Sequence, residues 1–227
     1  MTFASATPVL AAPKQIALPT GIGTDPDYDG PLPDLSLGKD PALAAEIEMA
    51  QEVLDRAPAG VMPYQVAQYF LAVSRGEYDP EWIPYVKGWP VRWNPVIVEL
   101  FRATSTKPEG DVTAWCAAFV NWCVSRGRGA IATGSASSGS FRCFGKEAAV
   151  PRPGDIVVFK RVGDDDACLG RGHVGFFVRE DDTHIAVLGG NQIEGSARSH
   201  MVSLKRLAKD GKILKLPSIR TDRRLHA

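Results

Sequence analysis

The first half of the chain carries apolar residues at helical spacing. One helix is predicted to begin with Asp40 as N-cap and Pro41 at its first position, and to end at the Pro-Ala-Gly sequence 58–60. A second helix is predicted to follow Pro63 and to stop near Gly76. Two further helices are predicted over 95–102 and 112–125.

In the second half the helical spacing gives way to short runs rich in β-branched and aromatic residues, which are typical of strands. Three strands, each preceded by a turn or a polar loop, are predicted over 156–159, 173–179 and 184–188. Helices therefore come first and an antiparallel meander follows, which predicts an α+β fold.

The two ends of the chain lack both patterns. Residues 1–40 are rich in proline and glycine, which predicts an extended, flexible arm rather than a helix or a central strand. Residues 218–227 include Arg220, Arg223 and Arg224 and are predicted to form a solvated basic tail.

The balance of acidic and basic residues disfavours some classes of binding partner. The chain has 26 basic and 26 acidic residues, so no global field favours nucleic acid or a membrane surface. No apolar run approaches the ~18 residues that a membrane-spanning helix needs, and we expect no membrane insertion. The N-terminal sequence lacks a positively charged region, and Pro8 interrupts its short apolar segment, so we expect no clear signal peptide.

Four cysteines are spread along the chain, at Cys116, Cys123, Cys143 and Cys168. Nothing resembles a short disulfide scaffold, so we expect buried or free thiols. No two cysteines have the close spacing of a structural zinc site, and the absence of a C-x-x-C sequence disfavours a thiol redox protein.

Cys116 is the candidate nucleophile. It lies in the first turns of the helix predicted over 112–125, with Asp111 as N-cap, where unpaired amides and the helix macrodipole favour a thiolate. The thiolate is the nucleophilic form of cysteine. Cys123 lies deeper in the same helix and is expected to be an inert core residue. Taken alone, Cys116 also fits the alternative of a small buried apolar residue.

His173 is the candidate base, because it opens a predicted strand where its ring can face a helix terminus. If 181–182 are the two turn residues of a hairpin, the register pairs His173 with Gly190 and brings Asn191 beside it. An amide there can accept from the second imidazole nitrogen and fix its tautomer. Asn191 can also be an ordinary turn residue. A slip of the register by one or two residues would favour Gln192 or Gly189 instead.

Four motifs resemble those of a known family. They are DVTAWCAAFVNW (111–122), PGDIVVF (153–159), GHVGFF (172–177) and VLGGN (187–191). In this order they resemble the motifs of the CHAP domains, cysteine- and histidine-dependent amidohydrolases/peptidases that are related to the NlpC-type peptidases. The resemblance implies a papain-like fold, with N-terminal helices packed on an antiparallel sheet. The resemblance covers a CHAP-like catalytic domain (89–217). With the composition and the helical spacing, the chain is predicted to divide into an arm (1–40), a helical N-terminal extension (41–88), this domain and a basic tail (218–227).

The resemblance assigns the site residues one by one. The family nucleophile falls on Cys116 and the base on His173. Many CHAP domains have a glutamate two residues before the asparagine of their third motif, and that position is Gly189 here. The asparagine matches Asn191, so the resemblance implies a Cys-His-Asn triad. Asp155 matches a motif position but is expected in a turn, and we exclude it from catalysis.

The implied activity is hydrolysis of peptidoglycan, either at the amide between sugar and stem peptide or at a bond within the peptide. The chemistry is acyl transfer through a thioester, and it requires no metal or other cofactor. We expect action in the periplasm or cell wall, reached by specialised secretion or by phage lysis. An inhibitor or immunity protein, or a secretion apparatus, is an expected partner.

Two alternative functions remain open at this point. One is a non-catalytic wall-binding module that uses the Trp-rich segment 81–95, although large aromatics more often fix an irregular linker to the core. The other is an intracellular cysteine peptidase with a protein substrate.

Overall fold

The computed structural model describes residues 40–111, 113–194 and 199–226, so nearly all of the predicted N-terminal arm lies outside the described residues. A six-stranded antiparallel sheet has the strand order β1-β6-β2-β3-β4-β5. Its strands are β1 (Lys146–Glu147), β2 (Ile156–Arg161), β3 (Gly172–Glu180), β4 (His184–Glu194), β5 (Ser199–Ala208) and β6 (Leu214–Thr221).

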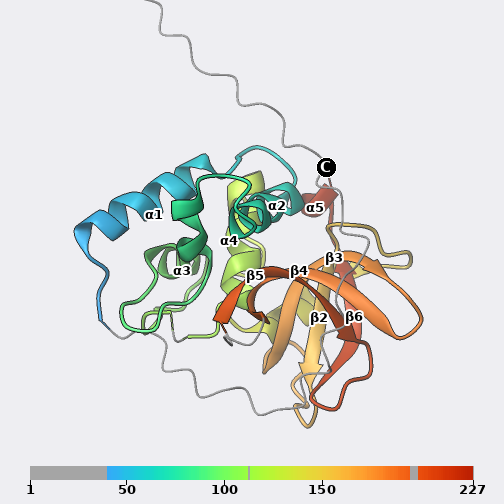
Figure 1. Cartoon of the computed structure of the whole chain (residues 1–227). Helices are drawn as coiled ribbons and strands as arrows, with labels where there is room; N and C mark the ends of the chain where they lie inside the picture. The colour runs from blue at the N-terminus through green and yellow to red at the C-terminus, as the bar shows by residue number, and fades with distance from the viewer. Residues whose placement is uncertain (1–39, 112, 195–198, 227) are drawn as a thin grey trace, which may run out of the picture.

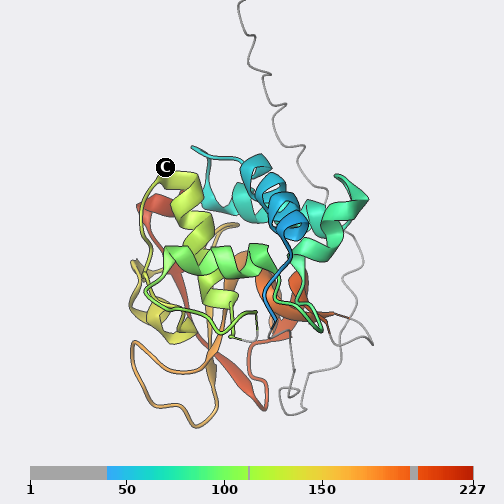
Figure 2. The same ribbon diagram turned by 90° about the vertical axis from the view of Figure 1, so that its left-hand side faces the viewer.

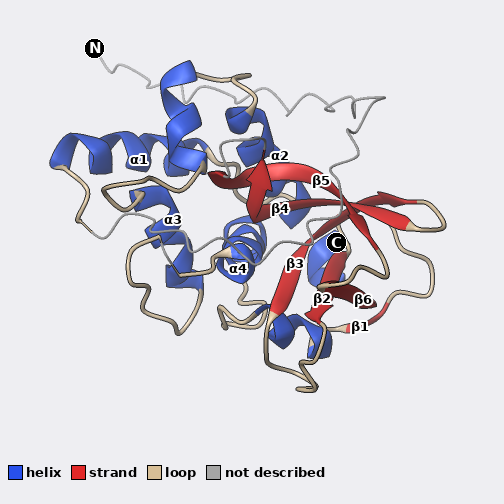
Figure 3. Ribbon diagram, turned by 60° about the horizontal axis from the view of Figure 1, so that its bottom comes forward, coloured by secondary structure: helices blue, strands red, loops and turns tan. Residues whose placement is uncertain are grey.

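The helices gather on one side of this sheet (Figure 1). They are α1 (Ala44–Arg56), α2 (Pro63–Ser74), α3 (Pro95–Leu100), α4 (Cys116–Arg128) and α5 (Arg223–His226), with 3-10 segments η1 (Pro80–Val86), η2 (Phe101–Ala103) and η3 (Ser138–Cys143). Seen from the helical side, α1 lies in front (Figure 2), and Figure 3 shows α4 between the other helices and the strands. The α+β class and the antiparallel sheet are confirmed, whereas the papain-like fold stays a prediction.

Helix α4 joins the two layers because it contacts α2 on one side and strands β3 and β4 on the other. The rings of Phe70 in α2 and Phe119 in α4 meet edge to face, with centroids 5.7 Å apart. Val174 and Phe176 of β3 complete the same buried cluster. The predicted N-terminal extension therefore shares one hydrophobic core with the CHAP-like part.

Strand β3 presents different residues to its two faces, because successive side chains of a strand alternate. Val174 and Phe176 face the helices, whereas Phe177 belongs to a second apolar cluster with Phe159. His173 is paired with Phe159 across the β2–β3 ladder and shares its face. The candidate base thus projects from the side of the sheet that the main helical core does not cover.

Both predicted N-caps are wrong, because each aspartate is used elsewhere. Helix α1 begins only at Ala44, while the Asp40 backbone accepts from Trp93 N–H (2.9 Å). The carboxylate of Asp111 accepts the backbone N–H groups of Trp89 and Asn94, both at 3.0 Å. Asp111 therefore ties the Trp-rich segment to the start of α3, and α4 begins at Cys116.

The C-terminal residues, expected to form a solvated tail, are part of the fold. Strand β6 pairs with β2 in the interior of the sheet. Leu225 is 1% exposed, and His226 Nε2 lies 2.7 Å from Oδ1 of the buried Asp155. The buried Leu225 side chain and the contact between His226 and Asp155 explain why this basic segment packs against the fold instead of extending into solvent.

Candidate active site

Cys116 is the first residue of α4, preceded by Trp115 as N-cap. Its side chain is nearly buried, with 4% of the residue exposed. Gly190 of β4 lets the strand pack closely on this helix start, because a Cβ there would lie 2.3 Å from the Trp115 ring. Helix α4 starts about one turn later than the helix predicted over 112–125, so Cys116 lies at its N-terminus.

The environment of Cys116 has two opposing effects on its ionisation. Burial raises the pKa of the thiol, while the backbone N–H groups of Val174, Ala117 and Cys116 itself act in the opposite direction. Burial is the larger effect. The amides at the helix start therefore favour the thiolate, as expected, but burial outweighs them and leaves the pKa of the thiol raised.

His173 lies in β3 with 9% of the residue exposed. Burial lowers the pKa of its ring to about 4; the Gln192 side chain opposes this, and Lys205 and His200 add to the lowering. The imidazole is therefore neutral at pH 7 and can accept a proton. Its Nε2 atom is buried and has no hydrogen-bond partner within the described ranges.

The hairpin register differs from the predicted one. Glu180 pairs with Ile185 rather than lying opposite Thr183, and a bulge between Phe177 and Arg179 shifts the ladder. A second irregularity falls between Gly189 and Gln192, where β4 pairs with β5. Each bulge adds a residue that simple counting from the turn does not include.

The second bulge brings Gln192, the weighed alternative, to the ring of His173. A Cβ on Gly189 would lie 3.5 Å from His173 Nε2 and 3.5 Å from the Gln192 amide. Gln192 is 3% exposed, and its Nε2 donates to the carbonyls of Gly189 (3.0 Å) and Ser203 (2.6 Å). These two acceptors fix the orientation of the amide, so Oε1 is the atom left to accept from His173.

Asn191 is directed to a different histidine. Its Oδ1 accepts from His200 Nδ1, and its φ of 58° makes it the one non-glycine residue with positive φ in the described ranges. Asparagine tolerates this left-handed conformation better than most residues. The predicted contact between Asn191 and the second nitrogen of His173 is therefore not formed.

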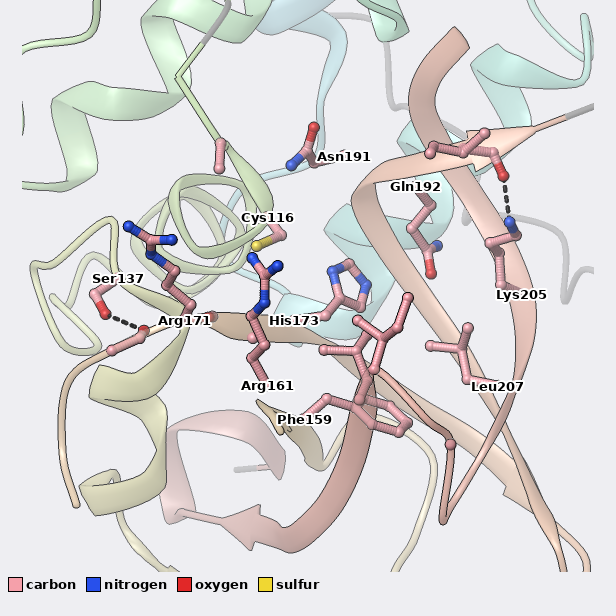
Figure 4. A pocket seen from close by; sticks show the side chains of 18 of the residues that line it. Cys116, Ser137, Phe159, Arg161, Arg171, His173, Asn191, Gln192, Lys205 and Leu207 are labelled. Atoms are coloured by element: carbon pink, nitrogen blue, oxygen red, sulfur yellow. Dashed lines mark hydrogen bonds between the residues drawn. The ribbon is translucent and has the colours of Figure 1, made fainter. Parts of the chain in front are cut away.

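Cys116, His173, Asn191 and Gln192 all line one cavity of about 590 Å³. In Figure 4 the ring of His173 lies between the sulfur of Cys116 and the amide of Gln192, while Asn191 lies above Cys116. The structure thus brings the three predicted site residues to one cavity and adds Gln192. Counting residues from the hairpin turn would have predicted Gln192 beside His173 only if the bulge between Gly189 and Gln192 had been included.

A disulfide between Cys143 and Cys168 supports one wall of this cavity, so the expectation of free thiols is wrong for these two residues. It joins the end of η3 to the loop before β3. Hydrogen bonds reinforce the connection: Ser137 Oγ donates to Gly170 O (2.9 Å), and Arg142 donates to Leu169 O (2.9 Å). Cys116 and Cys123 are free and buried.

Other kinds of site find little support in the described ranges. No cluster of three or more His, Cys, Asp or Glu side chains there could hold a metal ion. No helix in those ranges has the length and apolar character needed to cross a membrane. In the Trp-rich segment Trp82 is buried, and Trp89 is partly buried with its Nε1 donating to Pro84 O (2.8 Å). These rings pack within the protein.

Comparison with known proteins gives one finding. No curated protein and no solved structure matches the chain. The family model of the CHAP domain matches residues 108–191, a segment that includes Cys116, His173 and Asn191. This match confirms the resemblance to the CHAP-domain cysteine amidohydrolases/peptidases and suggests a hydrolase that acts on peptidoglycan amide bonds.

Proposed function

We propose that this protein hydrolyses an amide bond of peptidoglycan by nucleophilic catalysis, with Cys116 as nucleophile and His173 as general base and acid. One observation carries the proposal: the first residue of α4 is a cysteine that opens into the same cavity as a buried, neutral histidine. This pairing lies within the segment that matches the CHAP domain.

The reaction begins from a neutral pair, since burial keeps the proton on Cys116 and off His173. His173 takes the thiol proton as the sulfur attacks the amide carbonyl, so charge develops only along the reaction path. The protonated ring then donates this proton to the leaving amine, and the carbon–nitrogen bond breaks to give a thioester. Water, deprotonated by His173, hydrolyses the thioester and restores the thiol.

Gln192 acts as the positioning residue for His173. Its Oε1 and His173 Nε2 are both buried without a hydrogen bond in the described ranges, and each offers what the other lacks. Hydrogen bonds of this kind often tighten only when substrate binds. A carboxylate at position 192 would face the carbonyls of Gly189 and Ser203, which accounts for an amide rather than an acid at this position.

Asn191 supplies a donor for the oxyanion, together with the backbone N–H of Cys116 at the helix start. Its Oδ1 is bound to His200, so the Nδ2 group is the part of the amide that remains for the cavity. Donors held in a fixed position stabilise the negative charge of a tetrahedral intermediate. Asn191 thus takes part in the proposed reaction as an oxyanion donor, whereas the sequence predicted it as the residue that orients His173.

The setting of the reaction is an oxidising compartment outside the cytoplasm. The disulfide Cys143–Cys168 supports this part of the proposal, because such bonds persist in the periplasm and at cell surfaces. Delivery by specialised secretion or phage lysis, and control by an inhibitor or immunity protein, fit this setting. The scissile bond is either the sugar–peptide amide or an amide within the stem peptide.

Release of muropeptides from purified sacculi tests the proposal. The wild-type protein and Cys123→Ala, which removes the other free thiol of α4, should release the same products, whereas Cys116→Ala should release none. Mass spectrometry of the products identifies the bond. Equal release by wild type and Cys116→Ala would contradict nucleophilic catalysis. Sacculus binding without release by any of them would instead support the non-catalytic wall-binding alternative.

A further inference from the structure

We propose that Arg161 and Arg171 form a carboxylate-binding subsite in the cavity, which holds a free carboxylate of the peptidoglycan stem peptide beside the scissile amide. This inference rests on the proposed function and deepens it, because it names the group by which the substrate is recognised.

The two arginines are neighbours across the β2–β3 ladder. The backbone N–H of Arg161 donates to the carbonyl of Arg171 at 3.0 Å, one step beyond the paired residues Lys160 and Gly172. Arg161 lies two residues after Phe159 and Arg171 two residues before His173, so both share the face of the candidate base. In Figure 4 the guanidinium group of Arg161 lies beside the sulfur of Cys116, and that of Arg171 lies farther from the sulfur, on the side of Ser137.

Two like charges at opposite positions of a ladder destabilise a sheet. Within the described ranges, neither guanidinium forms a hydrogen bond or ion pair with a carboxylate. The acidic residues of the adjacent loop do not pair with these two guanidinium groups: Asp164 accepts the backbone N–H of Arg171 (2.5 Å) and lies 3.7 Å from Arg142, and Asp165 lies 3.6 Å from Lys160. Asp166 accepts backbone N–H groups of its own loop. No described carboxylate therefore relieves the repulsion between the two guanidinium groups, and an anion bound between them would relieve it.

Two cationic side chains, Arg161 and Arg171, line the cavity beside the candidate base, and no aspartate or glutamate is among its described lining residues. Cations that gather in a cleft raise the local concentration of anionic ligands. Arginine binds a carboxylate through two parallel N–H donors, which gives orientation as well as affinity. Stem peptides carry free carboxylates next to their amide bonds, so they supply this group within reach of Cys116.

The test uses two synthetic stem peptides that differ at one group, a free carboxylate beside the scissile amide or the corresponding carboxamide. Calorimetric titration of Cys116→Ala should show roughly 10–100-fold tighter binding of the carboxylate peptide, as expected for a charge-assisted bidentate contact. Adding Arg161→Gln or Arg171→Gln should remove this preference and leave carboxamide binding unchanged. Adding Arg102→Gln, whose side chain is 81% exposed and outside the cavity, should leave the preference intact.

Several results would overturn the subsite. One such result is equal affinity of Cys116→Ala for the two peptides. Another is that adding Arg161→Gln reduces the affinity for both peptides by the same factor. Equal binding of a standard acidic L-peptide would contradict the assignment to the stem peptide. Thermal unfolding controls for folding: Arg161→Gln should unfold at the same or a higher temperature, since it removes a like-charge contact. Because these titrations use Cys116→Ala, a failed sacculus assay refutes the catalysis without deciding the binding result.

Discussion

Two buried histidines, His173 and His200, occupy similar surroundings and are proposed to do different things. Burial lowers the pKa of each ring to about 4, and each has a buried Nε2 without a hydrogen-bond partner in the described ranges. Each also lies against one of two consecutive amides, Gln192 or Asn191. His173 lines the cavity with Cys116, whereas His200 does not. A lowered pKa is common to both rings and therefore does not distinguish the base. The cavity that His173 shares with Cys116 is the feature that favours His173.

The largest expected effect separates the two histidines directly. His173→Ala should reduce kcat for muropeptide release about 10²–10⁴-fold, because it removes the general base. His200→Ala removes only the support of Asn191 and should cost less than about tenfold. Steady-state rates on sacculi measure both. A larger loss from His200→Ala than from His173→Ala would reverse the assignment.

The two amides should differ in the same way. Gln192→Ala should lower kcat by roughly 10–100-fold and change the pH dependence of kcat/KM, since the tautomer of His173 is no longer fixed. Asn191→Gly, which keeps the left-handed backbone, should lower kcat without that change in pH profile.

Gln192→Glu serves as the matched control for the amide. It should not restore activity, because its carboxylate faces two carbonyl groups. Full activity of Gln192→Glu would contradict the positioning role proposed for the amide.

Acid should destabilise the fold through both histidines. Each folded-state pKa lies near 4, below the ordinary value of 6.5, so the unfolded chain binds more protons between these values. The free energy of unfolding should be highest above pH 6.5 and fall as the pH drops toward 4, by about 2–3 kcal/mol for a histidine as buried as His173. Urea unfolding from pH 7 to pH 4 measures this slope. His173→Gln should make it shallower, and an unchanged slope would show that other groups cause it.

Loss of the disulfide should affect the surroundings of His173 more than those of His200. The double variant Cys143→Ser/Cys168→Ser should lose about 2–4 kcal/mol of stability. It should also raise KM several-fold, because the loop that precedes His173 and carries Arg171 is less constrained. Cys123→Ser on α4 is the control for a general effect of cysteine replacement on KM. An unchanged KM in the double variant would show that the η3 contacts alone hold the loop.

Local chemistry made several elements predictable. The helical spacing after Pro63 and the β-rich runs at 156–159 and 173–179 correspond to α2, β2 and β3. The short helix at Pro95 was also predicted, and there Asn94 caps the helix by accepting from Val96 N–H (2.8 Å). Strands β5 and β6 were not predicted, because they lie in the polar and basic C-terminal part of the chain.

The N-caps and the triad required contacts that are distant along the chain. Asp111 precedes α4 but bonds to Trp89 and Asn94, which lie 22 and 17 residues earlier. Asn191 precedes Gln192 by one position, yet the bulge between Gly189 and Gln192 decides which of them reaches His173. Neither outcome follows from local spacing, because both depend on which partners the folded chain brings within hydrogen-bonding distance.

By itself, the sequence determined the α+β class, the motif series and the choice of Cys116 and His173 as the candidate nucleophile and base. These features depend on residue type and local period, which do not change on folding. Only the tertiary structure decided that the thiol keeps its proton, that Gln192 lies behind His173, and that Arg161 and Arg171 face one cavity. The reason is physical: burial, register and charge proximity are properties of segments far apart in sequence, and they exist only once the sheet and α4 have packed together.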